Sequence, residues 1–129
     1  MKSKDLRSLL LKLNNYLVRN LDTAHGLGLK RNHYEITPDH LWIALIEDGP
    51  GDIPLILKHY SIDEGRFTEK CQKNLEDLPA DYNAKPRLSR LIIDLLEEAW
   101  IISSVHHKEN KIRSGTLFEA FLVSDILVN

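Results

Sequence analysis

Histidines are the residues of this sequence best suited to hold a metal ion. The six of them form neither a His-Glu-x-x-His motif nor a quartet with cysteine, the arrangements that would identify a zinc site. His106 and His107 are neighbours on a predicted helix, so their rings point in different directions and cannot hold one ion together. The sequence therefore predicts no metal site.

Three other features have residue types for chemistry but lack the spacing. Residues 26–30, Gly-Leu-Gly-Leu-Lys, have neither the Walker spacing nor a preceding strand. Glu97 and Glu98 are adjacent on a predicted helix, which is typical of a solvated face. Cys71, the single cysteine, is interpreted as a small half-buried apolar residue in a reducing compartment. With no nucleophile beside a base, the sequence predicts a non-catalytic chain with no cofactor of its own.

Composition limits the class of protein and its partners. The 129 residues, 43% of them hydrophobic and 28% charged, fit one globular domain. The net charge of −2 argues against a nucleic-acid partner, which would select a basic surface. No apolar run approaches the roughly 18 residues of a membrane span, and residues 9–11 are too few for a signal-peptide core. We therefore expect a cytoplasmic protein that binds neither nucleic acid nor membrane.

Apolar residues recur at three- and four-residue steps almost throughout the chain, which predicts an all-α fold. Thr37-Pro38 is typical of a helix start, because a hydroxyl can cap free amides and proline suits the first helical position. Residues 79–87, with two prolines and no apolar period, are interpreted as a surface linker. The predicted helical stretches cover residues 3 to about 30, 38–48, 52–60, 63–78 and 88–105, and a last helix opens at Ser114.

Two halves of the chain share one pattern. A shift that sets Leu13 beside Leu88 aligns the helical stripes that follow, and one further residue of shift sets Ile36 beside Ile112. Each half is a long helix, a polar loop with an aliphatic residue, a capped start and a short apolar helix. This predicts a pseudo-twofold bundle of two helical repeats with an extra N-terminal helix. Residues 1–129 would form a single domain, divided into the extra helix (1–12), repeat 1 (13–48), connecting helices and linker (49–87) and repeat 2 (88–124).

The residues before Asn14 have no counterpart in the second repeat. Asn14 aligns with Ser89, and both are good helix caps, so the first repeat helix is predicted to begin there. The apolar stripe of residues 6–13 then belongs to a helix outside the repeats, with a bend or break near Asn14. The alternative is one continuous helix from residue 3 to residue 29.

The two short-helix segments resemble a family signature. Residues 36–47 are similar to the Ile/Val-Thr-x-Glu-His-Leu-Leu-x-Ala-Leu-Leu motif of Clp N-terminal domains, with Asp39 in place of the usual Glu. Residues 112–122 resemble its second copy, and residues 56–63 resemble the connecting helix and turn of that family. The resemblance covers about residues 13 to 129 and implies an all-helical, two-repeat fold.

Within that family the chain is most similar to the ClpV (TssH) unfoldases of type VI secretion, through residues 12–14, the loop 31–34 and residues 98–100 followed by 112–115. This resemblance implies a recognition domain that binds the N-terminal helix of the large sheath subunit, TssC or VipB, for sheath disassembly and recycling. It also implies two AAA+ ATPase modules beyond residue 129, which would bind ATP and Mg²⁺. The isolated domain would be a monomer and the full-length protein a hexamer.

The residues themselves indicate a site of the same kind. A helix outside the repeats makes a groove where it meets the repeat helices, and a partner helix can lay its apolar face into such a groove. The residues predicted to line it are Leu6, Leu10, Leu13, Asn14 and Leu17 on one side and Leu88 and Leu91 on the other, with Arg87 and Arg90 placed to orient an acidic partner segment.

Two other functions compete with this interpretation. The first is the N-domain of a ClpA, ClpB or ClpC chaperone that binds adaptors or unfolded protein. The extra first helix argues against it, because those domains usually begin at the equivalent of Asn14. The second is a stand-alone small enzyme or regulator, and the lack of a catalytic constellation argues against that.

Overall fold

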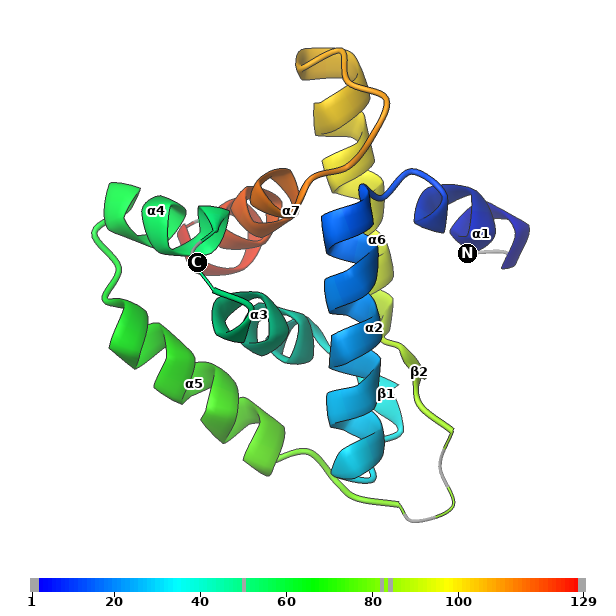
Figure 1. Cartoon of the computed structure of the whole chain (residues 1–129), viewed down its shortest axis with the longest axis vertical. Helices are drawn as coiled ribbons and strands as arrows, with labels where there is room; N and C mark the ends of the chain where they lie inside the picture. Colours follow the sequence, from blue (N-terminus) through cyan, green and yellow to red (C-terminus); the bar gives the residue numbers. More distant parts are fainter. Residues whose placement is uncertain (1–2, 50, 82, 84, 128–129) are drawn as a thin grey trace. The chain divides into compact units, whose positions relative to one another are not determined.

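The computed structural model describes residues 3–49, 51–81, 83 and 85–127, and these form the all-α fold that the sequence predicts (Figure 1). Two strands of two residues, β1 (Glu35–Ile36) and β2 (Arg87–Leu88), accompany the helices. α6 and α7 continue into the π-helical turns η1 (Ile102–His106) and η2 (Leu122–Leu127). The α-helices of the described residues are α1 (Ser3–Leu10), α2 (Asn15–Lys30), α3 (Pro38–Glu47), α4 (Asp52–His59), α5 (Glu64–Glu76), α6 (Arg90–Ile101) and α7 (Ser114–Phe121).

The chain divides into two compact units, and each unit combines parts of both repeats. Unit 1 comprises residues 1–19 and 93–129, and unit 2 comprises residues 20–92. The division passes through α2 and α6, the long helices of the two repeats. The repeats and the compact units are therefore different divisions of the chain. No helix in the described part of either unit is long and apolar enough to cross a membrane.

In unit 1, the turn after α1 pairs with the segment before α7. Leu13 and Ile112 form a parallel bridge. The Asn14 N–H donates to the Ile112 carbonyl at 3.0 Å, and the Ile112 N–H donates to the Lys12 carbonyl at 2.7 Å. Because residues 12–14 are held in this extended pairing, α1 and α2 are separate helices. The predicted break near Asn14 is confirmed, and the alternative of one continuous helix is wrong.

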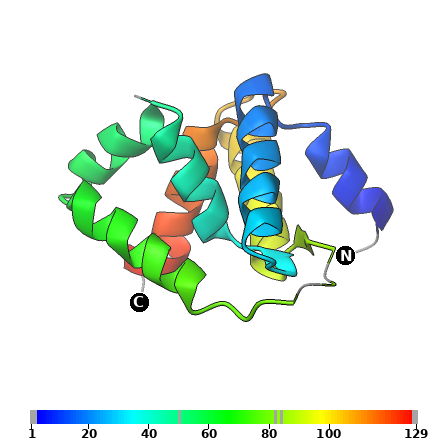
Figure 2. The same cartoon turned by 60° about the horizontal axis from the view of Figure 1, so that its bottom comes forward.

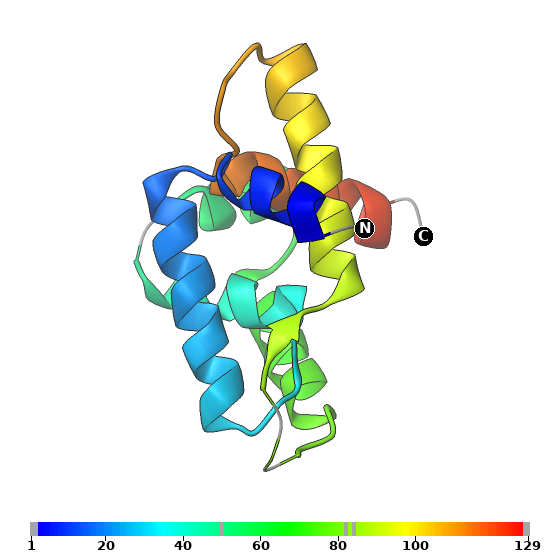
Figure 3. The same cartoon turned by 90° about the vertical axis from the view of Figure 1, so that its right-hand side faces the viewer.

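The other part of unit 1 is a helical hairpin. α6 runs into η1, and the chain returns from there to α7 (Figure 3). The Ser104 hydroxyl donates to the Trp100 carbonyl at 2.7 Å, inside the last turns of this helix. The predicted helix over 88–105 is therefore confirmed from Arg90 onward, with a wider π-helical turn at its end, but its predicted start is wrong because Leu88 belongs to β2.

In unit 2, α3 is the central helix and contacts α4, α5 and β1 (Figures 1 and 2). Residues 40–45 of α3 are all buried, and Trp42 is completely inaccessible. α4 and α5 also contact each other. The strands β1 and β2 run parallel, with Glu35 opposite Arg87 and Ile36 opposite Leu88.

The backbone pairings of the two units are related by the repeat. Leu13 pairs with Ile112 in unit 1, and Leu88 pairs with Ile36 in unit 2. Leu88 is the repeat counterpart of Leu13, and Ile112 is that of Ile36. Each pairing therefore joins the start of one repeat's long helix to the start of the other repeat's short helix, which confirms the two-copy organisation.

The long helices of both repeats begin with a side-chain cap. Asn14 Oδ1 accepts the Leu17 N–H at 2.8 Å, and Ser89 Oγ accepts the Ile92 N–H at 3.2 Å. Each cap satisfies an amide that the first turn of a helix leaves without a partner. These two predicted caps are confirmed.

The short helices begin differently from each other. Before α3, the Thr37 N–H donates to His40 Nδ1 at 2.9 Å, and Pro38 takes the first helical position. α7 begins after Arg113, whose side chain makes no cap hydrogen bond. The prediction of a capped start in both halves is therefore wrong for the second, because Ser114 lies within the helix rather than before it.

The segment 79–87 is more structured than the predicted surface linker. Ala80 forms an antiparallel bridge with His33, the Asp81 N–H donates to the Asn32 carbonyl at 2.8 Å, and the segment ends in β2. Pairings of one or two residues leave no alternating pattern in the sequence, which is why they were not predicted. Residues 82 and 84 lie outside the described residues.

His33 and His40 form a buried pair in unit 2. Their side chains are 4% and 0% exposed, and His33 Nδ1 lies 2.9 Å from His40 Nε2. Because His40 Nδ1 accepts the Thr37 N–H, the His40 proton is on Nε2 and is donated to His33. Both rings are therefore neutral. Burial, followed by the nearby His33, lowers the pKa of His40 to about 4, and burial also lowers the pKa of His33.

Acidification is expected to destabilise the domain through this pair. The unfolded chain has an ordinary histidine pKa of 6.5, so it binds more protons than the folded chain as the pH falls from there towards about 4. The contribution of His40 to the free energy of unfolding is fully present above pH 6.5. It is lost as the pH falls from 6.5 to about 4, and the loss amounts to about 3 kcal/mol. The raised pKa of the half-buried Asp39 carboxyl acts in the opposite direction. Urea unfolding at neutral and mildly acid pH measures the difference.

Two variants separate the buried pair from the other histidines. His59→Gln changes an exposed ring and should leave the pH dependence unchanged. His40→Gln should remove most of it, because the ring whose pKa is lowered to about 4 is then absent and His33 is the one ring of the pair that still has to gain a proton. A free energy of unfolding in the unchanged protein that stays flat across this pH range would contradict the prediction.

Candidate partner-helix site

α1 is an amphipathic helix that buries only part of its apolar stripe. Leu9 is 7% exposed, whereas Leu6 and Leu10 are half-buried. Leu11, which follows the last turn, is 69% exposed. A helix of eight residues is not stable alone in water, so tertiary contacts keep it folded. Its partly covered leucines are therefore an apolar surface that the domain itself does not use fully.

The turn between α1 and α2 is fixed by contacts within unit 1. Lys111 Nζ donates to the Leu11 carbonyl at 2.9 Å, and the Lys12 ammonium lies 4.9 Å from the centre of the Trp100 ring. A cation above an indole face is attracted by the quadrupole of the ring. Together with the Leu13–Ile112 pairing, these contacts hold the C-terminal end of α1 in place.

Three of the residues predicted to line the groove serve the fold instead. Leu13 and Leu17 are 4% and 1% exposed, so they have no free surface for a partner. Asn14 uses its side-chain oxygen to cap α2. All three lie on the same apolar stripe as Leu6 and Leu10, and helical periodicity alone does not distinguish a buried position from a half-buried one.

The other predicted residues belong to unit 2, in β2 and at the start of α6. Leu88 is half-buried and Leu91 is 42% exposed. Arg87 and Arg90 are both exposed. This short stretch thus presents two aliphatic and two basic side chains, separated by the buried cap residue Ser89.

Leu11 directly follows α1 and is accessible, but it was not predicted from the sequence to line the groove. It lies off the three- and four-residue stripe, so periodicity assigned it to neither the core nor the groove. A large apolar side chain outside the stripe was the available signal, since an exposed apolar group beside a partly exposed stripe enlarges a binding surface.

The accessible side chains of these two stretches suit binding rather than bond-making chemistry. The described residues include no group of three His, Cys, Asp or Glu side chains that could hold a metal ion. Cys71 is 2% exposed, and burial, with the Asp39 carboxyl nearby, raises the pKa of its thiol. A thiol held in this way stays protonated and unreactive. Cys71 is more deeply buried than predicted, which agrees with its interpretation as a core residue.

Comparison with known families matches residues 12–127 to the Clp repeat (R) N-terminal domain. Comparison with curated proteins gives no match. The matched range leaves out residues 1–11, which contain α1, in agreement with a helix that lies outside the repeats.

Solved structures extend the comparison to nearly the whole chain. The N-terminal domain of the ClpV1 ATPase from the Sci1 type VI secretion system of E. coli EAEC is 32% identical, with a TM-score of 0.85 over 98% of this chain and 77% of that one. The N-domain of ClpV from Vibrio cholerae is 29% identical, with a TM-score of 0.81 over 92% and 70%. A complex of a ClpV N-domain with a VipB peptide is 28% identical, with a TM-score of 0.77 over 92% and 72%.

Proposed function

Because this chain belongs to the Clp repeat (R) N-terminal domain family, we propose that it is the substrate-recognition domain of a ClpV-type unfoldase. In this proposal it binds the N-terminal helix of a type VI sheath subunit of the TssC or VipB kind, so that contracted sheaths are disassembled and recycled. The domain recognises the sheath and performs no bond-making chemistry.

The observation that carries this proposal is the partly uncovered α1. Leu6 and Leu10 are half-buried on a helix that stands outside both repeats, and Leu11, directly after this helix, is largely exposed. A similar domain, the ClpV N-domain in the complex described above, holds a VipB peptide. A partner helix that lays its apolar face on these leucines would use the helix-in-groove mode of recognition.

The expected affinity is micromolar. Complete burial of one leucine side chain contributes about 1.5–3 kcal/mol, and Leu6, Leu10 and Leu11 are already partly covered. They therefore supply a few kcal/mol of the roughly 8 kcal/mol that a micromolar complex requires, and the partner's own contacts supply the remainder. Association also costs the freedom of the partner helix, which keeps a single short helix from binding much more tightly.

The stretch in unit 2 is proposed to contribute separately. Leu88 and Leu91 offer aliphatic surface, and the exposed Arg87 and Arg90 offer charge to an acidic segment of the partner. Exposed charges mainly raise the association rate and set orientation. Neutralising both arginines should therefore weaken binding most at low ionic strength.

We further propose that the domain acts as part of a longer, cytoplasmic protein. That protein would carry two AAA+ modules and assemble as a hexamer, and ATP and Mg²⁺ would bind to those modules. The nucleotide supplies the energy for unfolding when bound there, and the residues of this chain deliver the sheath subunit. Walker motifs encoded after codon 129 would support this part of the proposal, and a stop codon there would contradict it.

Calorimetric titration of the 129-residue chain tests the binding function. The probe is a synthetic peptide with the sequence of the N-terminal helix of the sheath subunit encoded in the same genome. We expect a single site with a Kd in the micromolar range. A scrambled peptide of identical composition is the control. No heat with millimolar peptide, or equal binding of the scrambled peptide or of an unfolded model protein, would contradict the proposal, and the latter result would favour a general chaperone domain.

A further inference from the structure

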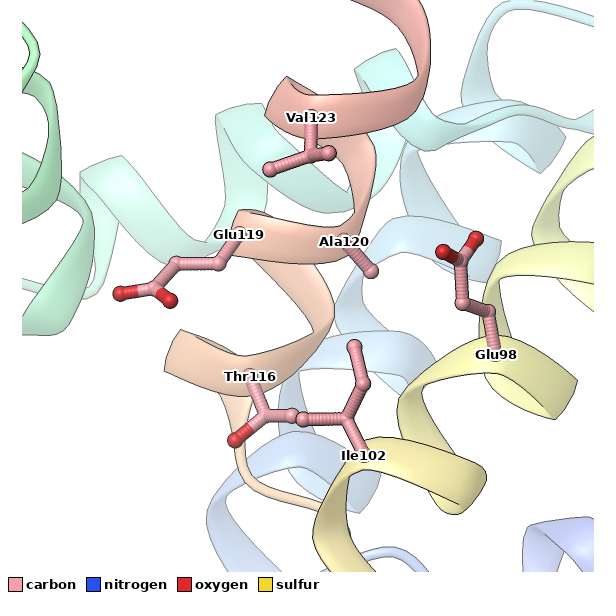
Figure 4. Close-up of a pocket in the computed structure, with 6 residues that line it drawn as sticks. All are labelled: Glu98, Ile102, Thr116, Glu119, Ala120 and Val123. Carbon is pink, nitrogen blue, oxygen red and sulfur yellow. The ribbon is translucent and has the colours of Figure 1, made fainter. Parts of the chain in front are cut away.

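A second uncovered surface lies in unit 1, on the face shared by the end of α6 and by α7. It is a shallow pocket of about 110 Å³, shown in Figure 4. Its residues have no member in common with α1 or with the residues predicted to bind the sheath helix. It is lined by Glu98, Ile102, Thr116, Glu119, Ala120 and Val123.

The floor of the pocket is aliphatic, and two further exposed aliphatic side chains stand on the same helix outside the residues that line it. Ile102 and Ala120 face the hollow, and Val123, which lines it, is 44% exposed (Figure 4). Ile101 and Val105, one helical turn apart on α6 and η1, are 56% and 62% exposed. Single exposed aliphatic residues are ordinary, so the surface that a partner could cover is the hollow itself, with its aliphatic floor and the accessible Val123 at its edge.

Two carboxylates stand on opposite sides of this aliphatic floor. Glu98 and Glu119 flank Ala120 in Figure 4, and both side chains are exposed. Glu98 accepts a hydrogen bond from the Ser124 hydroxyl at 3.1 Å. No lysine, arginine or histidine is among the residues that line the pocket. The pocket thus combines an apolar centre with negative charge on two sides and no positive charge of its own.

We propose that this pocket binds a segment of a partner protein that carries one aliphatic side chain between two basic ones. The aliphatic side chain would fill the hollow over Ile102 and Ala120, and the basic side chains would reach Glu98 and Glu119. On a helical segment, residues three or four positions apart share a face and are separated by about 5–6 Å along the axis. A Lys-x-x-x-Leu-x-x-x-Lys pattern therefore fits one face of such a segment. The sheath-helix site would remain free while the pocket is occupied.

The test uses the whole 129-residue chain labelled with ¹⁵N and an alanine-based helical peptide that carries this Lys/Leu/Lys pattern. We expect saturable amide shifts at Ile102, Ala120 and Val123, and none along α1. A peptide with glutamates in place of the lysines and a peptide with alanine in place of leucine are the matched controls. Each should weaken binding at least tenfold, and raising the salt concentration should weaken binding of the lysine peptide because exposed charges are screened.

Variants of the chain distinguish this pocket from the sheath-helix site. The double variant Glu98→Gln, Glu119→Gln keeps the size of both side chains. It should weaken binding of the lysine peptide at least tenfold and leave the Kd of the sheath peptide unchanged. The control is Glu97→Gln, which changes an exposed residue of α6 that does not line the pocket. It should change the Kd of neither peptide. Equal shifts with the glutamate peptide, shifts confined to α1, or no shifts at millimolar peptide would overturn the proposal. Each of these outcomes leaves the proposed sheath recognition untouched.

Discussion

Leu10→Asp is expected to weaken binding of the sheath helix at least 100-fold, which corresponds to a loss of about 2.7 kcal/mol or more in binding free energy. Leu10 lies half-buried on α1, so part of its side chain is available to a partner. In the complex the new carboxylate would lie against the apolar face of the partner helix, and removing a charge from water into apolar surroundings is costly. Calorimetric titration of both proteins with the same sheath peptide measures the difference.

Two further variants keep this prediction informative. Leu11→Asp changes a side chain that is already 69% exposed, so it should weaken binding without loss of stability. Leu55→Asp, on α4, changes a leucine with the same 69% exposure in the other unit and should leave binding unchanged. Helical circular dichroism and a cooperative melt should be retained in all three. Unchanged binding in both α1 variants would contradict a role for α1, and unfolding of Leu10→Asp would assign Leu10 to the core.

Trp42→Ala is expected to lower the free energy of unfolding by about 3–5 kcal/mol. Trp42 has no exposed surface and occupies the middle of α3, the helix against which α4 and α5 pack. Removing the indole leaves a cavity that buried neighbours on α3, such as Leu41 and Leu45, fill only in part. A loss of this size is a large fraction of the total stability of a small domain.

Urea unfolding followed by circular dichroism measures this loss without relying on tryptophan fluorescence. Leu55→Ala removes apolar atoms from an exposed position of the same unit and should cost less than about 0.5 kcal/mol. A loss of under 1 kcal/mol for Trp42→Ala would show that the core of unit 2 does not depend on this side chain.

The fold follows closely from patterns that are visible in the sequence. The aligned pairs Leu13/Leu88 and Ile36/Ile112 identified the repeat, and the structure uses the same four residues for its two backbone pairings. Asn14 and Ser89 were recognisable as caps because short polar side chains before an apolar stripe have few other roles. The separate α1 followed from the repeat, since its residues had no counterpart.

What the sequence did not reveal depends on contacts between distant residues. From periodicity, Leu10 and Leu17 were both predicted to line the groove, yet Leu17 is fully buried and Leu10 is half-buried. Burial depends on which other parts of the chain pack against each side chain. The pairing of His33 with His40 requires the turn between them and gives no periodic signal. The pocket beside Glu98 was likewise hidden, since its residues come from α6, η1, α7 and η2.

The most direct measurement of the central claim is the chemical-shift map of the ¹⁵N-labelled chain titrated with the sheath-helix peptide. We expect saturable shifts at Leu6, Leu10 and Leu11, with a Kd that matches calorimetry, and smaller shifts at Leu88 and Leu91. Shifts that leave α1 unchanged and gather elsewhere, for example around Ile102 and Val123, would rule out sheath-helix binding at α1, as would the absence of any shift at millimolar peptide.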